Sequence, residues 1–271
     1  MPTKLATQGL SKTFRKGTVA IEALRDISLT IEEGEFVSVV GASGCGKTTF
    51  LRILDGLIRA TSGSVKVDGR DVTRPGPDRA FVFQQDALMP WRTVAGNASF
   101  GVELRGGTDH AAKRRTSDFL RMVGLSGFDK YFPHEISGGM RQRVNIARAL
   151  SVDPDILLMD EPFAALDAQT REIMQAELMR IWQQTRKTIV LITHQIEEAV
   201  FLSDRVFVFT ARPGRLKEEI VVNLPRPREL SIKRTVEFVQ FTDRIWRLIE
   251  EEVREGIRRE RLEASAHAPG A

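Results

Sequence analysis

The stretch FVSVVGASGCGKTTFLRIL, residues 36–54, places a glycine-rich loop between two apolar segments. The apolar run 36–40 is typical of a buried strand, and residues 47 to about 58 have the spacing of a helix. Between them, Gly41–Thr48 matches the pattern G-x-x-x-x-G-K-[ST] of a phosphate-binding loop. A strand, a glycine loop and a helix in this order predict an α/β fold with a nucleoside triphosphate site.

The residue types of this loop suit an anion. Glycine lets backbone N–H groups approach phosphate oxygens, and the N-terminus of the following helix adds partial positive charge. Lys47 is expected to reach the β- and γ-phosphates, and the Thr48 hydroxyl to bind Mg²⁺. The nucleotide-binding residues predicted here are Gly41, Ala42, Ser43, Gly44, Cys45, Gly46, Lys47, Thr48 and Thr49. Kinases, GTPases and motor ATPases share such a loop, so it does not predict a particular reaction.

Strands and helices alternate along most of the chain, which favours a parallel sheet. Short β-rich runs in residues 3–40 predict hairpins, and helical spacing from about 93 to 150 predicts an inserted helical subdomain. Further strands are predicted at 64–67, 79–83, 155–160, 188–193 and 205–210. Helices are predicted at 167–185, 195–203 and 231 to about 262.

The composition is that of an ordinary soluble globular protein, with 42% hydrophobic and 28% charged residues in a chain of 271. A net charge of +4 does not by itself predict nucleic-acid binding. The single cysteine, Cys45, cannot form an internal disulfide, which fits a reducing cytoplasm. Neither a signal peptide nor a membrane-spanning run is predicted, so a membrane role would need a partner.

Two further motifs narrow the chemistry. In DILLMDEP, residues 155–162, an apolar strand ends at Asp160, which is expected to hold Mg²⁺, and Glu161 is expected to orient or deprotonate a water. In ISGGMRQRVNIARAL, residues 136–150, Ser137-Gly138-Gly139 precedes a helix and predicts a second anion-binding helix N-terminus. Two copies facing head to tail would use both phosphate-binding ends, whereas the alternative is a plain helix cap with two turn glycines.

From about Leu5 to Leu224, these motifs together resemble the ATP-binding subunits of ABC transporters. The resemblance identifies residues 41–49 as Walker A, SGGMRQ as the signature motif, ILLMDE as Walker B and 165–167 as the D-loop. It implies that Glu161 is the catalytic glutamate and His194 the switch histidine. It also implies that Gln84 senses the γ-phosphate and Mg²⁺, that Phe14 stacks on adenine, and that Ser137, Gly138 and Gly139 contact nucleotide.

The stretches 76–104, 160–178 and 191–215 look most like the nitrate, sulfonate and taurine branch of bacterial importers. That branch implies a RecA-like P-loop NTPase core over residues 1–230, with an antiparallel β subdomain and an inserted α-helical subdomain at about 88–152. It further implies a homodimer at the cytoplasmic face of the inner membrane that uses ATP and Mg²⁺. The implied partners are a transmembrane permease and, indirectly, a periplasmic substrate-binding protein, with no nucleic acid.

Two positions depart from the family pattern, and two assignments have alternatives. Met140 stands where many members have glutamine, and Gln195 follows His194 where aspartate is usual, which bears on a contact across the dimer. Gln85 is an alternative to Gln84 as the sensing glutamine. Phe14 could also belong to the core.

Several features outside the motifs have two interpretations each. Cys45 is either a small residue tolerated in the loop or a redox-sensitive thiol, whose pKa a helix N-terminus would lower. The basic residues of the segment after 210 form either a solvated face or a contact with anionic lipid. These residues are Arg212, Arg215, Lys217, Arg226, Arg228, Lys233 and Arg234.

Residues 231–271 are predicted to form a C-terminal helix and a disordered tail from 264 to 271. The helix is expected to pack on the core or on its twin, through apolar residues that recur on one side. These residues are Ile232, Val236, Val239, Trp246, Ile249, Val253 and Ile257.

DALMPWRTV, residues 86–94, gathers apolar side chains in a predicted loop. Rimmed by Asp86 and Arg92, it predicts a docking site for the permease, because Met and Trp suit adaptable contacts of large area. The alternative is that Trp91 packs inside the helical subdomain.

Rival functions fit less well. DNA-repair ATPases place a long coiled coil between Walker A and the signature, whereas 89 residues separate Lys47 from Ser137. Translation ATPases carry two such domains in one chain, and a small-molecule kinase would not need the Ser-Gly-Gly helix. Exporter ATPases are the closest rival and are often fused to membrane helices. The transported solute is left open.

Overall fold

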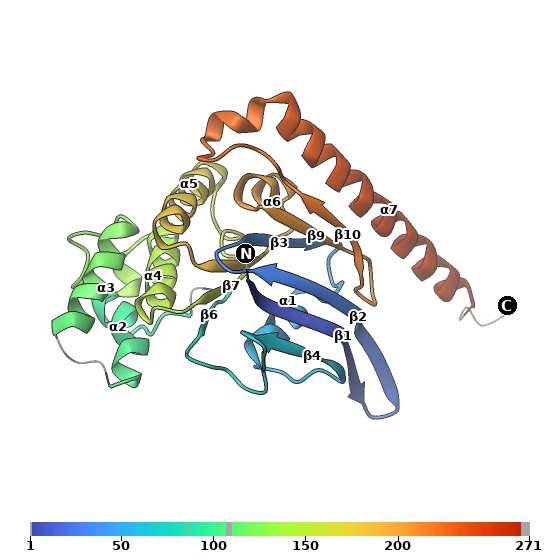
Figure 1. Ribbon diagram of the computed structural model, residues 1–271, viewed down its shortest axis with the longest axis horizontal. Coiled ribbons are helices and arrows are strands. Elements are labelled where there is room, and N and C mark those ends of the chain that lie inside the picture. The colour runs from blue at the N-terminus through green and yellow to red at the C-terminus, as the bar shows by residue number, and fades with distance from the viewer. Residues whose placement is uncertain (1, 86, 107–109, 267–271) are drawn as a thin grey trace.

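The computed structural model describes residues 2–85, 87–106 and 110–266, with residues 112 and 255–266 described by their backbone alone. Figure 1 shows two sheets in the body, a group of helices (α2, α3 and α4) at one end and a long C-terminal helix, α7, along one side. Within the described part of the chain, no helix is both long and apolar enough to cross a bilayer.

The central sheet has the strand order β10-β9-β3-β8-β7-β6 over the described residues. These strands are β3 (Phe36–Gly41), β6 (Arg79–Val82), β7 (Ile156–Asp160), β8 (Thr188–Ile192), β9 (Arg205–Phe209) and β10 (Leu216–Val221). All neighbours are parallel except β9 and β10, which form an antiparallel hairpin. Strands β3, β7 and β8 are buried along their whole length, as expected for a parallel sheet covered on both faces.

Alternate residues of the central strands enter two different hydrophobic clusters, because successive side chains of a strand point to opposite faces. On β7, Ile156 and Leu158 join a cluster with α1 (Lys47–Asp55) and the second sheet. Leu157 and Met159 join a cluster with the later helices. The second sheet is antiparallel, in the order β2-β1-β4-β5. Its strands are β1 (Thr3–Lys16), β2 (Val19–Glu32), β4 (Ser62–Val67) and β5 (Arg70–Asp71).

Over the described residues, three α-helices lie between β6 and β7 in the chain, namely α2 (Val94–Leu104), α3 (His110–Met122) and α4 (Gly138–Ser151). The side chain of Thr93 caps α2, and the side chain of Ser137 caps α4 by accepting from the Met140 N–H. Helices α5 (Ala168–Thr185) and α6 (Ile196–Leu202) follow β7 and β8. The predicted α/β architecture, with an antiparallel β part, an inserted helical part and a C-terminal helix, is confirmed.

The C-terminal helix α7 (Val236–Ala266) follows a short 3₁₀ turn at Leu230–Arg234. It packs on the body through Phe238 and Ile245, which are buried, whereas most of the predicted side faces solvent. The exposed members are Val236, Val239, Trp246 and Val253, while Ile232 and Ile249 pack at the edge and the Ile257 side chain lies outside the described atoms. The predicted side is therefore not the one that packs on the core, and its packing on a second copy stays a prediction.

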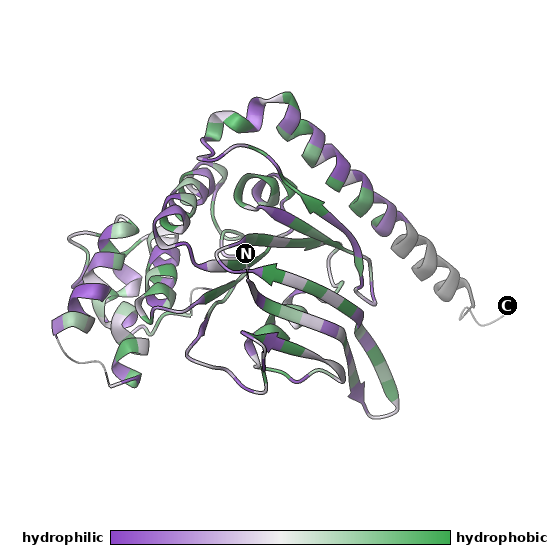
Figure 2. Ribbon diagram, in the orientation of Figure 1, coloured by the Kyte–Doolittle hydropathy of each residue, from purple (hydrophilic) through white to green (hydrophobic). Residues whose placement is uncertain are grey.

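The physical reason is that α7 has two apolar stripes at helical spacing. Hydrophobic and hydrophilic bands alternate along it in Figure 2. The stripe that carries Phe238, Phe241 and Ile245 is the one packed on the core. The helix also continues to Ala266, so disorder at 264–266 was wrong, and residues 267–271 lie outside the described part.

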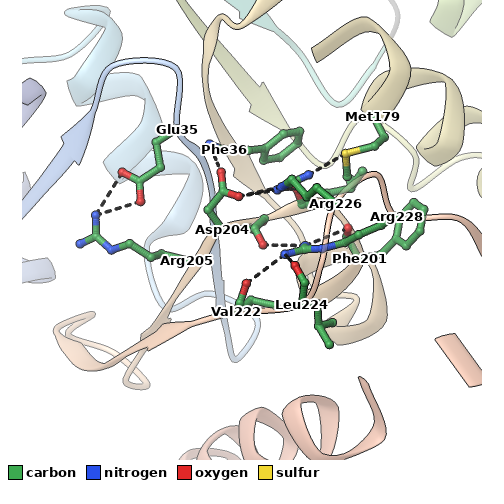
Figure 3. Close-up of polar contacts among 12 residues, drawn as sticks. Glu35, Phe36, Met179, Phe201, Asp204, Arg205, Val222, Leu224, Arg226 and Arg228 are labelled. Atoms are coloured by element: carbon green, nitrogen blue, oxygen red, sulfur yellow. Dashed lines mark hydrogen bonds and ion pairs between the residues drawn. The ribbon is translucent and has the colours of Figure 1, made fainter. Parts of the chain in front are cut away.

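Two arginines predicted to lie on a solvated face are internal. The Arg228 side chain donates to main-chain oxygens around the end of α6, namely those of Val200, Phe201, Ser203, Val222 and Leu224 (Figure 3). Arg226 bonds Asp204 and the Leu202 oxygen, and its guanidinium lies 4.1 Å from the Trp182 ring centroid. Both arginines therefore complete the C-terminus of α6, whose last carbonyls have no partner within the helix. Arg215 and Arg234 are exposed as predicted.

Candidate active site

The phosphate-type loop joins β3 to α1 and passes very close to neighbouring backbone. A Cβ at Gly41 would lie 2.8 Å from the main-chain oxygen of Phe209, on the adjacent strand β9. A Cβ at Gly46, where φ is +100°, would lie 2.8 Å from the main-chain oxygen of Ala23, on β2. Glycine is required at both positions because any side chain would push the loop away from the strands behind it.

Lys47 and Thr48 begin α1 and point in different directions. Lys47 is 7% exposed, and its ammonium donates to the main-chain oxygens of Gly41 and Ala42, at 2.8 and 3.0 Å. The Thr48 hydroxyl donates to a carboxylate oxygen of Asp160 at 3.0 Å. Burial raises the pKa of the Asp160 carboxyl, and the Thr48 hydrogen bond opposes that rise. This pair of oxygen ligands fits Mg²⁺, which prefers oxygen and usually keeps several waters.

Glu161 is the centre of a second polar group. Its Oε2 lies 3.2 Å from the Gln84 Nε2 and 3.1 Å from the His194 Nδ1. These three residues follow β6, β7 and β8, which are neighbours in the sheet, so their carboxyl ends meet at one edge. Glu161 has a positive φ of 47°, a backbone conformation that costs on the order of 1–3 kcal/mol and is concentrated at functional sites.

A cavity of about 700 Å³ joins the loop to this polar group. It is lined by Phe14, Ile21, Ala23, Ser43, Gly44, Gly46, Lys47, Thr48, Thr49, Gln84, Glu161, His194 and Arg212. Phe14 is 43% exposed, with the Lys12 ammonium 5.0 Å from its ring centroid, so it is a partly open cavity wall and not a core residue. Ile21 and Ala23, from β2, extend the apolar end of the cavity.

Four of the predicted residues do not line the cavity. Gly41, Ala42 and Asp160 lie behind its wall, where they accept hydrogen bonds from Lys47 and Thr48. Cys45 is fully buried, and burial raises the pKa of its thiol. The alternative interpretation, a redox-sensitive thiol with a lowered pKa, is therefore contradicted, because desolvation of the thiolate outweighs the neighbouring positive charge. Gln85 is exposed and does not line the cavity, in contrast to Gln84.

Ser137, Gly138 and Gly139 are not brought to the cavity of their own chain. They form the start of α4, and a Cβ at Gly139 would lie 3.0 Å from the Thr170 Cγ2. The start of α4 therefore packs beside the start of α5, where the Asp167 side chain accepts from the Thr170 N–H. Met140 is partly buried against the core.

Several polar residues behind the site were not predicted. Arg171 donates to the Leu166 main-chain oxygen and, at 3.2 Å, to the side-chain oxygen of Gln195. Gln195 is therefore engaged within its own chain. The Thr193 hydroxyl donates to the Glu198 carboxyl, whose burial raises its pKa to about 8.

Arg212 lines the cavity, although its sequence context predicted a solvated face. Its place in the fold explains the miss: it follows β9, and β9 is the direct neighbour of the strand that precedes the loop. That adjacency cannot be read from the spacing of residues along the chain.

Comparison with known proteins agrees with this geometry. The sequence matches the ABC transporter family over residues 24–164. The nitrate import ATP-binding protein of Synechocystis sp. is 47% identical over 246 residues, which cover 89% of this chain and 92% of the relative. The taurine import ATP-binding protein of Pelagibacter ubique is 44% identical over 262 residues, 92% of this chain and 97% of the relative.

Among solved structures, a dimeric ATP-binding cassette in a post-hydrolysis state bound to ADP and Pi has a TM-score of 0.72 and 33% identity. The match covers 82% of this chain and all of that chain. The family match includes the glycine loop, Asp160 and Glu161, which meet at the same edge of the sheet. The chain therefore belongs to the ABC transporter family, in the branch of ATP-binding subunits that includes the nitrate and taurine import proteins.

Proposed function

We propose that this chain is the ATP-hydrolysing subunit of an importer that takes up a small anionic solute, such as a sulfonate, taurine or nitrate. The observation that supports it most directly is the approach of Gln84 and His194 to Glu161 beside the glycine loop. The names of the relatives support import. Their identities of 47% and 44% are too similar to choose between nitrate and taurine.

In the proposed mechanism, Glu161 orients and deprotonates the water that attacks the γ-phosphate. Its carboxylate is held by the Gln84 amide, and by His194 when the imidazole carries its proton on Nδ1. In that tautomer Nε2 is a hydrogen-bond acceptor. Thr48, Asp160 and Gln84 would hold Mg²⁺, which supplies positive charge to the phosphates when bound.

A second copy of the chain would complete the site. Ser137 and Gly138 start a helix whose N-terminal N–H groups suit phosphate, and they lie away from the cavity of their own chain. Two chains facing head to tail would place each helix start against the nucleotide of the other. In the assembled importer the dimer would lie at the cytoplasmic face of the inner membrane, below a permease supplied with solute by a periplasmic binding protein.

The contact with the permease is proposed to include the loop 87–93. Trp91 is 74% exposed, so it does not pack inside the helical part. Asn97, which is fully buried, holds the loop by accepting from the Met89 N–H and donating to the main-chain oxygens of Met89 and Arg92. Arg92 itself bonds Glu103, and Asp86, the other predicted rim residue, lies outside the described residues.

Substitution Glu161→Gln tests the catalytic assignment. The variant should bind ATP normally and lose ATP turnover by about 10²–10⁴-fold, the usual contribution of a positioned general base. It should also accumulate as a dimer in ATP, measured by size-exclusion chromatography, because the closed pair would no longer be opened by hydrolysis. Glu197→Gln, an exposed glutamate three residues after His194, is the matched control. Near-normal turnover by Glu161→Gln would contradict the mechanism.

A further inference from the structure

The turn between β9 and β10, residues 210–215, contributes one residue to the lining of the nucleotide cavity. Arg212 in this turn lines the cavity, and its Nη2 lies 3.4 Å from the main-chain oxygen of Gly44 in the glycine loop. That contact is long for a hydrogen bond, so the guanidinium keeps its donors for a better acceptor. Arg212 lies beyond residues 24–164, the part of the chain that matches the family.

The turn is fixed against the back of the loop by its main chain. The Gly214 N–H donates to the Ala23 oxygen, and the Arg25 N–H donates to the Gly214 oxygen, both at 2.9 Å. A Cβ at Gly214 would lie 2.1 Å from the main-chain oxygen of Cys45, which leaves room for glycine only. The backbone that carries Arg212 is thus held in place before any nucleotide arrives.

The same turn is tied to the C-terminal helix. The Ala211 N–H donates to the Glu252 Oε2 of α7 at 2.8 Å. The Glu252 side chain is 12% exposed and also pairs with Lys217 of β10 at 2.9 Å. Its neighbour Glu251 pairs with the same lysine but is 65% exposed and makes no contact with the turn among the described residues. Helix α7 therefore contacts the residue next to Arg212 through one carboxylate.

Among the described residues, no side chain neutralises the charge of Arg212. Within the described part of the chain, no carboxylate lies at ion-pair distance from its guanidinium. An uncompensated guanidinium beside a phosphate-binding loop suits phosphate oxygens, which it can bind with two parallel hydrogen bonds.

We propose that Arg212 binds the phosphate chain of the nucleotide, and that Glu252 positions it through the main chain of Ala211. The proposal rests on the proposed function, since it assumes that ATP occupies this cavity. It assigns a binding residue to the β9–β10 turn and gives α7 a direct influence on nucleotide affinity.

The first test compares nucleotide affinity in the full chain with Arg212→Gln and with Arg215→Gln, an exposed arginine of the same turn that does not line the cavity. Arg212→Gln should lower the affinity for ATP and ADP about tenfold, which is the effect of one charge-assisted hydrogen bond. Arg215→Gln should leave both affinities unchanged. Tripolyphosphate, which has no base or ribose, is then used to displace a fluorescent ATP analogue from the protein. Its affinity for the Arg212→Gln variant should be about tenfold lower than its affinity for the native chain. Unchanged competition by tripolyphosphate would overturn the phosphate assignment.

The second test addresses positioning. Glu252→Ala should lower the affinity for ATP several-fold. Glu251→Ala makes the same charge change and removes a partner of the same lysine, but it should leave the affinity unchanged. In the Arg212→Gln background, Glu252→Ala should have no further effect, because its influence passes through Arg212. Equal effects of Glu252→Ala in both backgrounds would show that Glu252 acts otherwise.

Lys47→Ala separates failure of this proposal from failure of the proposed function. If Lys47→Ala no longer binds ATP and Arg212→Gln binds ATP like the native chain, the cavity is the nucleotide site and Arg212 is not a ligand. If Lys47→Ala also binds ATP normally, the nucleotide site itself has been assigned wrongly.

Discussion

Replacing Arg228 with glutamine should destabilise the fold strongly, because this buried guanidinium holds the end of α6. The side chain is 4% exposed, and Figure 3 shows it surrounded by main-chain oxygens. Burial and the neighbouring Arg226 lower the pKa of Arg228 to about 10, so it is still charged at neutral pH. A cation at this position also interacts favourably with the C-terminal end of the helix dipole.

The magnitude follows from the contacts that the substitution removes. Four of the hydrogen bonds measure 2.8–3.1 Å, and the one to Leu224 measures 3.4 Å. A glutamine amide has two donors and a shorter reach, so at least two buried oxygens lose their partner, at about 1–3 kcal/mol each. Relief of the desolvation of the charge offsets part of this loss. The expected decrease in the free energy of unfolding is about 3–5 kcal/mol, a large share of a typical total.

Denaturant unfolding at pH 7.5, followed by circular dichroism and tryptophan fluorescence, measures the change. Arg234→Gln removes an exposed arginine from the neighbouring 3₁₀ turn and should change the stability by less than about 0.5 kcal/mol. A loss below about 1 kcal/mol for Arg228→Gln, with the two probes coincident, would refute the argument that these carbonyls depend on Arg228.

Three further predictions concern the pairing of chains, pH and the permease. Lys47→Ala and Gly138→Asp chains should each be inactive in ATP hydrolysis. Their mixture should recover part of the native rate, because each mixed dimer keeps one intact site. Mixed dimers that form, as verified by native mass spectrometry, and are inactive would count against the shared site. Burial raises the pKa of Glu198 to about 8, above its value in the unfolded chain, so the stability it contributes is full below about pH 4.5 and lost as the pH rises through 8. The free energy of unfolding of Glu198→Gln, measured in urea, should therefore rise relative to that of the native chain by on the order of 3 kcal/mol between pH 5 and 9. A difference between the two proteins that does not change with pH would contradict the assignment. Trp91→Cys should crosslink to a cytoplasmic loop of the permease in the assembled complex, since the native thiol is buried, and absence of a crosslink in an active complex would exclude this loop from the interface.

Features that depend on neighbouring residues could be predicted from the sequence. The glycine loop, the strand before it and the helix after it are contiguous, and their residue types match the local geometry directly. Asp160 and Glu161 end a short apolar run, and Ser137 stands where a helix cap is expected. The alternation of strands with helices predicts the parallel sheet, because a crossover helix is the usual connection between parallel strands.

Features that depend on which segments meet required the tertiary structure. The family resemblance favoured Gln84 over Gln85, but only the structure shows that Gln84 approaches Glu161 at the end of β6. Arg212 and Arg228 look alike in a basic segment, yet one lines the cavity and the other caps α6. The two apolar stripes of α7 have the same spacing, and the packed one is chosen by the surface of the body. In each case the energy comes from contacts between residues far apart in the chain, which local spacing does not encode.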